Sequence, residues 1–210
     1  MNTKEKILYT ALHLFARRGY EAVSVSDIAG EVGMTKGALY KHYESKRDIF
    51  DHIVRRMYET DEKQSEACRV PAETYEENTA AYTGISIGDF RRFTLAQFSF
   101  WTEDAFGADF RRMLTLEQYH SAEAADLYRN SLTEGPVGYT ADIFREMLAA
   151  GVLSGEDARA LAVEFYAPMY LFLCMSDDTE DKAALRHALE DHVDRFFKEH
   201  QNNTTKGETT

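Results

Sequence analysis

The sequence predicts an all-α protein. Only three of its 210 residues are proline, and it contains no strongly alternating run of Val, Ile and Thr of the kind that marks a half-buried strand. Apolar residues instead recur three and four residues apart along most of the chain. Hydrophobic residues make up 44% of the composition, which is enough for the packed core of one large or two small domains.

The first helix is predicted over residues 3–18 and ends at Gly19. Its apolar positions share one face, as in an amphipathic helix that packs on a core. These positions are Ile7, Leu8, Ala11, Leu14 and Phe15, and Tyr20 and Val23 in the connection that follows should close the same small core.

A second, short helix is predicted over residues 25–32. Ser24 precedes it and Asp27 stands three residues later, which is the arrangement of a capping box. Gly33 occupies the position where a left-handed residue ends a helix, and Thr35 can cap a third helix over residues 35–46. Two short helices joined by a glycine-containing turn are typical of a DNA-reading unit. An ordinary corner between two helices with a solvated polar face shows the same pattern.

The third helix has an unusual polar surface. Its apolar side is narrow, because only Leu39 and Tyr43, four residues apart, share it. Small residues near its start allow a partner to approach closely, and its positive charges suit a polyanion. The pattern therefore predicts a helix that sits in a groove of DNA and presents Lys36, Gly37, Ala38, Tyr40, Lys41 and His42.

These motifs resemble the N-terminal domain of the TetR family of bacterial repressors. The similar segments are residues 24–29 (SVSDIA), 32–43 (VGMTKGALYKHY) and 45–46 (SK), together with Ile7, Ala11, Leu14, Phe15, Gly19 and Tyr20 at the family's spacing. The close resemblance covers about the first 50 residues, and beyond residue 60 it is only architectural. Tyr43 stands where the family usually has Phe, which leaves a hydroxyl that needs a partner or water.

The resemblance implies a fold and a function. It implies an all-α chain with an N-terminal three-helix helix-turn-helix DNA-binding domain at residues 1–46 and a helical ligand-binding and dimerisation domain at 47–200. The polar composition of residues 201–210 predicts a disordered tail. It implies a dimeric transcriptional repressor that a small-molecule ligand releases from a palindromic double-stranded DNA operator. By the same resemblance, Lys36, Gly37, Ala38 and Lys41 face base edges, and Ser24, Thr35, Tyr40, His42 and Lys46 hold phosphates.

The charge distribution agrees with a DNA reader. The net charge of −12 by itself argues against nucleic acid, but residues 1–47 hold eight Lys and Arg against five Asp and Glu, a net +3. The remainder holds 16 against 31, a net −15. A basic N-terminal segment followed by an acidic remainder fits a DNA-binding protein whose acidic part does not contact the phosphates. An acidic surface also simply favours solubility.

The rest of the chain predicts further helices. A linking helix should run from residue 45 or 46 into the 60s, and residues 64–88 are irregular with a short helix at about 72–81. Glu134, Gly135 and Pro136 should break the chain, and Pro168 should kink the helix that contains it. The remaining helices are expected at about 89–102, 108–132, 137–150, 155–175 and 181–199.

The predicted body is rich in aromatic residues and methionine. Core filling explains most of them, yet Tyr, Trp and Met also suit an adaptable pocket. The resemblance implies a small-molecule site here, for an apolar or aromatic ligand, with a cation as a further option because the surroundings are acidic. The candidate lining is Phe93, Phe98, Trp101, Phe110, Met113, Tyr119, Tyr128, Phe144 and Tyr166.

The last two helices carry apolar residues on more than one side. One side can face the core and the other needs a partner, so pairing with a two-fold copy would form the four-helix bundle that the family uses. A fully intramolecular core is the alternative. The candidate homodimer residues are Phe165, Met169, Tyr170, Phe172, Leu173, Leu189, Val193 and Phe196.

Catalytic and metal-binding patterns are missing from the sequence. It has no glycine-rich phosphate loop, no nucleophile elbow and no histidine pair at zinc spacing. Glu117, His120 and Glu123 share a helix face, for which a solvated polar face is the simpler explanation. We therefore expect no enzyme, no cofactor and no metal. A small-molecule carrier or enzyme with an incidental helix-turn-helix remains the alternative function.

The sequence also predicts the compartment. Cys68 and Cys174 are expected to be free thiols in a reducing cytosol. The N-terminus is polar, without the apolar core of a signal peptide. The most apolar stretch, residues 165–175, looks too short to span a membrane, so we expect a cytoplasmic protein without membrane contact.

Overall fold

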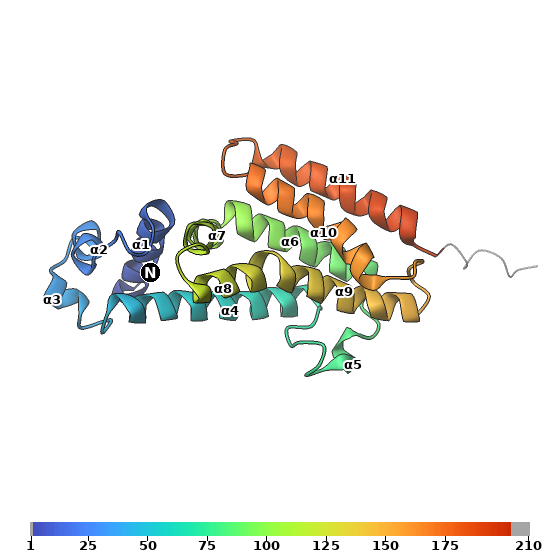
Figure 1. Ribbon diagram of the computed structural model, residues 1–210, viewed down its shortest axis with the longest axis horizontal. Helices are drawn as coiled ribbons and strands as arrows, with labels where there is room; N and C mark the ends of the chain where they lie inside the picture. The colour runs from blue at the N-terminus through green and yellow to red at the C-terminus, as the bar shows by residue number, and fades with distance from the viewer. Residues whose placement is uncertain (1, 203–210) are drawn as a thin grey trace, which may run out of the picture. The chain divides into compact units, whose positions relative to one another are not determined.

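The structure is a computed structural model, and it describes residues 2–202 (Figure 1). Every regular element in this range is a helix, and an isolated bridge pairs Leu153 with Gln201. The all-α prediction is confirmed. Most of the predicted disordered tail, residues 203–210, lies outside the described residues.

Eleven helices follow one another along the described residues (Figure 1). They are α1 (Thr3–Arg18), α2 (Val25–Val32), α3 (Lys36–Leu39), α4 (Lys46–Cys68), α5 (Thr79–Tyr82), α6 (Ile87–Glu103), α7 (Ala105–Glu117), α8 (Ala122–Leu132), α9 (Glu134–Ala149), α10 (Ala158–Met175) and α11 (Lys182–His200).

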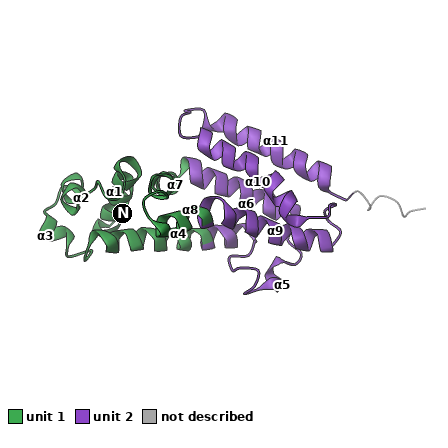
Figure 2. Cartoon of the chain, viewed as in Figure 1, with its two compact units in different colours: residues 1–61, 103–129 green, residues 62–102, 130–210 purple. Residues whose placement is uncertain are grey.

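The helices form two compact units (Figure 2). Unit 1 consists of residues 1–61 and 103–129, and unit 2 consists of residues 62–102 and 130–210. Unit 1 therefore combines the N-terminal helices with α7 and most of α8, and α4 is shared between the units at residues 61 and 62. The proposed end of the DNA-binding domain at residue 46 stays a prediction.

The predicted bounds of α1 and α2 are confirmed, and the caps explain why. Asn2 forms a capping box with Glu5 at the start of α1, and Ser24 forms one with Asp27 at the start of α2. Gly33 ends α2 in the left-handed conformation, with φ 82° and ψ 36°.

Two predicted helices have different bounds. The third is only the four residues of α3, because Tyr43 turns inward and Ser45 starts α4 by accepting the Asp48 N–H at 3.0 Å. The helix predicted over residues 108–132 is two helices, α7 and α8. Ser121 separates them, because its hydroxyl accepts the Ala124 N–H at 3.0 Å and so caps a new helix.

Smaller differences occur in unit 2. α5 is shorter than predicted, since it contains only residues 79–82. α9 begins before the predicted break, because Pro136 lies in its first turn, where no backbone N–H is needed. α10 begins at Ala158, where Asp157 accepts the N–H groups of the next turn at 2.8 and 3.2 Å.

An aromatic cluster forms the core of unit 2. Neighbouring rings within it have centroids 5.0–6.3 Å apart, the usual range for packed aromatic pairs. The cluster joins α6, α9, α10 and α11 and consists of Phe90, Phe144, Phe165, Phe196 and Phe197.

One helix of the described range, α10, is long and apolar enough by length and composition to cross a membrane. Its 18 residues, 158–175, have a mean hydropathy of 1.2, and they extend the apolar stretch that the sequence marked at residues 165–175 toward the N-terminus. In the structure 33% of these residues are buried, and a helix in the core of a globular protein passes the same test. Pro168 lies inside the helix, as the sequence predicted.

Candidate nucleic-acid interface

The capping box of α2 fixes the start of the helix-turn-helix. The Ser24 hydroxyl accepts the Asp27 N–H at 3.1 Å, and the Asp27 carboxylate accepts the Ser24 N–H at 2.8 Å. The hydrogen bond from the Ser24 side chain is the largest cause that lowers the pKa of Asp27 below its usual value, followed by the bond from the Ser24 backbone. The carboxylate is therefore ionised at neutral pH, as the cap requires.

The second helix of the motif, α3, separates apolar from polar residues sharply. Thr35 caps it by accepting the Ala38 N–H at 3.2 Å. Leu39 and Tyr43 are 0% and 2% exposed, so they anchor the segment to the small core of α1, α2 and α4. What remains outside is the polar surface that the sequence singled out.

The structure brings the predicted DNA-binding residues together on the α2–α3 segment and the start of α4. Ala38 and Lys46 are half-buried. The exposed residues are Ser24, Thr35, Lys36, Gly37, Tyr40, Lys41 and His42. The Lys36 ammonium lies 5.8 Å from the centre of the Tyr40 ring, which is a cation–π distance.

Lys46 differs from the other predicted phosphate ligands, because its ammonium is engaged within unit 1. It donates to the Tyr20 carbonyl at 2.8 Å and lies 4.1 Å from the centre of the Tyr20 ring. Glu21 is a further partner at 3.9 Å. Lys46 thus joins the start of α4 to the α1–α2 connection, a role that its position in the sequence did not indicate.

Tyr43 has a partner for its hydroxyl, which donates to the Lys4 carbonyl at 3.1 Å. Its ring packs edge-on against His52 at 5.1 Å, and the Lys4 ammonium lies 5.1 Å from its centre. Burial is the largest cause that raises the pKa of Tyr43 to about 12. The tyrosine thereby ties α1 to the end of the α3 segment.

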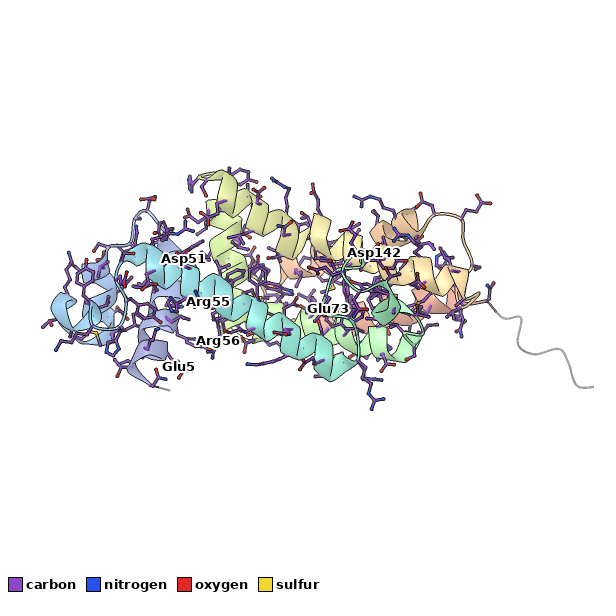
Figure 3. The ribbon with its side chains drawn as sticks, turned by 90° about the horizontal axis from the view of Figure 1, so that it is seen from below. Glu5, Asp51, Arg55, Arg56, Glu73 and Asp142 are labelled. Carbon is purple, nitrogen blue, oxygen red and sulfur yellow. The ribbon has the colours of Figure 1, made fainter. Side chains whose placement is uncertain are left out.

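A groove beside Tyr43 gathers basic side chains that the sequence reading missed. Lys4 and His52 line it together with Arg55 and Arg56 of α4. Figure 3 labels Arg55 and Arg56 on α4, and Arg56 forms a 3.7 Å ion pair with Glu5 of α1. No local signal could reveal the groove, because its walls are about 50 residues apart in the sequence.

The predicted ligand-lining residues fall into both units. Unit 1 holds Phe110, Met113, Tyr119 and Tyr128, and unit 2 holds Phe93, Phe98, Trp101, Phe144 and Tyr166. Within unit 2, Phe144 belongs to the aromatic cluster, Trp101 packs on Phe100 at 5.1 Å, and the Tyr166 hydroxyl donates to the Leu132 carbonyl at 2.9 Å. Tyr119 is 84% exposed.

The predicted dimer residues have mixed positions. Tyr170 and Phe172 are half-buried. The other six pack inside unit 2 of the same chain: Phe165, Met169, Leu173, Leu189, Val193 and Phe196. A different apolar row lies on the surface of α10, with Val163, Ala167, Leu171 and Met175 at successive four-residue steps, all exposed.

The polar groups considered for metal binding have other partners. Glu117 accepts the Tyr20 N–H, and Glu123 binds Arg47. A different group, Glu164, Glu199 and His200, has its potential ligand atoms within 4.8 Å of one another, with both carboxylates exposed. Cys68 and Cys174 are free thiols, as predicted.

Comparison with known proteins places the helix-turn-helix in a family. Residues 7–53 match the model of the bacterial regulatory proteins of the tetR family. A segment of 46 residues is 44% identical to the uncharacterized HTH-type transcriptional regulator YerO of Bacillus subtilis (strain 168), and it covers 22% of this chain and 16% of that protein. A segment of 52 residues is 38% identical to IcaR, the negative transcriptional regulator of the biofilm operon icaADBC in Staphylococcus aureus (strain Newman), and it covers 25% of this chain and 28% of that protein. The chain thus matches less than a third of the length of these relatives.

Solved structures resemble the chain over nearly its whole length. The complex of SmeT with triclosan, SmeT being a repressor from Stenotrophomonas maltophilia, has a TM-score of 0.68 at 18% identity and covers 99% of this chain and 96% of that one. A transcriptional regulator from Saccharomonospora viridis in complex with choline has a TM-score of 0.64 at 20% identity, with 95% and 98% covered. At these identities the likeness shows the fold. The N-terminal segment therefore matches the TetR family of bacterial regulatory proteins in sequence, and the whole chain resembles solved regulators in fold.

Proposed function

We propose that the protein is a dimeric transcriptional regulator, acting as a repressor that a small molecule releases from a palindromic operator. The observation that carries the proposal is the surface of α3, where two buried anchors hold a helix whose exposed side is small and basic. A solvated corner between two helices needs neither feature. The match of residues 7–53 to the family model supports the same conclusion.

The residues of the motif divide into two roles in this proposal. Lys36, Gly37, Ala38 and Lys41 face base edges and specify the sequence. Phosphate contacts position the protein on the duplex, and Ser24, Thr35, Tyr40, His42 and Lys46 make them.

The dimer face is assigned to the exposed apolar row on α10. Val163, Leu171 and Met175 are 49%, 56% and 48% exposed, although they are large apolar residues. Together with Ala167 they form a row of four exposed apolar residues on one helix, which needs a partner surface. A two-fold copy supplies one, and two-fold symmetry matches a palindromic site. Sedimentation at micromolar concentration should therefore give about twice the chain mass of 24.0 kDa.

The ligand site is assigned to the aromatic interior around Phe93, Phe98 and Trp101, with an apolar or aromatic compound as its occupant. Relatives with this fold form complexes with triclosan and with choline. A ligand acts by preferring one conformation of the protein. It then changes the spacing of two recognition helices that must match successive DNA turns of about 34–36 Å. We further propose that the protein acts in the cytoplasm, where its DNA is, and that it is not an enzyme.

The test is binding to the DNA upstream of the protein's own reading frame, measured by gel shift at rising salt. Specific binding with a steep salt slope supports the proposal. Lys36→Ala and Lys41→Ala should weaken specific binding by roughly 1–3 kcal/mol and relax the sequence preference. Lys63→Ala is the matched control, because Lys63 is exposed on α4 outside the motif. If both α3 variants bind as tightly as the wild type, α3 is not the reader.

A second assay separates the alternatives. A panel of apolar, aromatic and cationic compounds is tested for release of the protein from the DNA fragment. Release by one compound supports a ligand-controlled regulator. Turnover of a compound without any specific DNA binding would instead favour an enzyme or carrier that has an incidental helix-turn-helix.

A further inference from the structure

A buried glutamate stands at the end of α7. Glu117 is the last residue of that helix and only 6% exposed, unlike most of the charged residues in the described range. Burial of a carboxylate is costly unless partners compensate it. Its position adds to the cost, because the C-terminal end of a helix carries partial negative charge and disfavours an acid. A charged residue whose burial and whose position at the helix C-terminus are both unfavourable is a candidate for a functional role.

The carboxylate reaches the connection between α1 and α2. Glu117 Oε1 accepts the Tyr20 backbone N–H at 2.8 Å, across 97 residues of sequence. Gly19 makes room for it, since a Cβ atom at Gly19 would lie 3.1 Å from Oε1, and its φ of 82° suits glycine. The missing side chain of Gly19 therefore leaves the space that the Glu117 carboxylate occupies.

The backbone carbonyl of Tyr20 also has a partner, which comes from α4. The Lys46 ammonium at the start of α4 donates to the Tyr20 carbonyl at 2.8 Å. The Tyr20 ring packs between Phe15 and Phe50, with centroids 5.1 and 5.4 Å away. Both backbone polar groups and the ring of Tyr20 are thus fixed, and α2 begins only five residues later.

Two more polar contacts connect the same elements. Arg47 of α4 binds Glu123 of α8 through two hydrogen bonds of 2.5 and 2.6 Å. His13 of α1 and Asp109 of α7 form a 2.9 Å contact. Each pair has at least one side chain that is about half exposed, so each contributes little to stability. Glu117 is the buried member of the set, and unit 1 contains all of the residues in these contacts.

We propose that Glu117 is a positioning residue for DNA recognition, which sets the orientation of the helix-turn-helix by holding Tyr20 to α7. This inference rests on the proposed function. Its consequence is that α2 and α3 move together with α7 and α8. The spacing between the two recognition helices of a dimer then depends on Glu117, although Glu117 itself touches no DNA.

The experiment compares three variants with the wild type. Glu117→Met keeps the side-chain size but removes the acceptor of the Tyr20 N–H. Glu117→Gln keeps an oxygen that can accept it. Asp126→Ala is the matched control, because Asp126 is an exposed carboxylate on α8 whose partner, Arg129, lies on the same helix.

Three DNA fragments separate positioning from recognition: the natural operator, the operator with one base pair inserted between its half-sites, and a single half-site. We expect Glu117→Met to bind the natural operator about tenfold more weakly, which corresponds to about 1.4 kcal/mol. It should discriminate less against the inserted base pair and bind the single half-site like the wild type. Glu117→Gln and Asp126→Ala should both behave like the wild type.

A purely structural role would lower the melting temperature and weaken all three fragments in proportion, and that result overturns the inference. Unchanged operator affinity and spacer preference in Glu117→Met overturn it as well. If Glu117→Met does not fold, hydrogen exchange in the wild type decides: a Tyr20 amide that exchanges as fast as an exposed one refutes the contact. A wild type that binds no DNA specifically refutes the proposed function instead, so the two failures are distinguishable.

Discussion

Replacing Gly37 with alanine should stabilise the protein and weaken its binding to DNA. Gly37 is the second residue of α3 and exposed, and a Cβ atom built there meets nothing within 4 Å. Its φ lies outside the range that favours glycine, unlike that of Gly33. The fold therefore gives no reason for glycine at this position, and a partner that approaches closely does.

The expected magnitudes have opposite signs. Alanine is preferred over glycine by about 0.8–1 kcal/mol in the interior of a helix. α3 has only four residues, so we expect about 0.5 kcal/mol and a rise in melting temperature of about 1–2 °C for a chain of this length. On DNA the added methyl group occupies the space of a base edge. Loss of a good base contact costs about 1–3 kcal/mol, or about 5- to 150-fold in affinity.

The assay measures thermal unfolding and operator affinity on the same protein preparations, with non-specific DNA as a reference. Gly30→Ala is a matched control, because Gly30 is an exposed glycine inside α2 with nothing within 4 Å of a built Cβ. It should be stabilised by up to about 1 kcal/mol and bind the operator like the wild type.

Two results would refute the reasoning. If Gly37→Ala binds the operator with unchanged affinity and sequence preference, the backbone of α3 does not approach the bases. If Gly30→Ala loses as much affinity as Gly37→Ala, the loss comes from a stiffer helix-turn-helix and not from a blocked contact.

Four further predictions concern other parts of the chain. Lys46→Ala should lower the melting temperature, because the Tyr20 carbonyl loses its charged donor. It should also reduce the salt slope of DNA binding by about one unit, because it removes the proposed phosphate contact. Leu171→Glu, at a position that is 56% exposed, should give monomers in sedimentation without lowering thermal stability. If this variant stays dimeric, the exposed apolar row on α10 is not the dimer interface. Trp101→Ala should leave operator binding intact and blunt release by the ligand, whereas loss of both would identify Trp101 as ordinary core. Burial raises the pKa of Tyr43 and of Tyr82 to about 12. Their contribution to stability is therefore complete below about pH 10 and is lost as pH rises toward 12. A spectroscopic titration should show that ionisation of these tyrosines and unfolding of the protein occur together.

Local signals in the sequence predicted α1 and α2 correctly to the residue. Their caps consist of residues three positions apart, Asn2 with Glu5 and Ser24 with Asp27, so the information lies within one helical turn. The same kind of signal was missed at Ser121, which caps α8 and divides a predicted single helix. The apolar pattern continues across the division, and periodicity alone therefore could not show it.

The candidate DNA-binding surface could also be predicted, because α3 is short and its two anchors are four residues apart. The dimer and ligand surfaces could not. The sequence prediction placed Phe165 in the dimer interface and did not include Leu171, yet Phe165 is 2% exposed and Leu171 is 56% exposed. Only the packing of α10 against its neighbours in unit 2 distinguishes the two.

The sequence by itself determined where α1 and α2 begin and end, and which side of α3 stays polar. Capping and helical periodicity decide these features, and both act over a few residues. Only the tertiary structure decided that Glu117 holds the Tyr20 N–H and that Lys46 holds the Tyr20 carbonyl, over separations of 97 and 26 residues. A buried polar group must find a partner wherever the fold brings one within about 3 Å, and no pattern of neighbouring residues records which distant group that is.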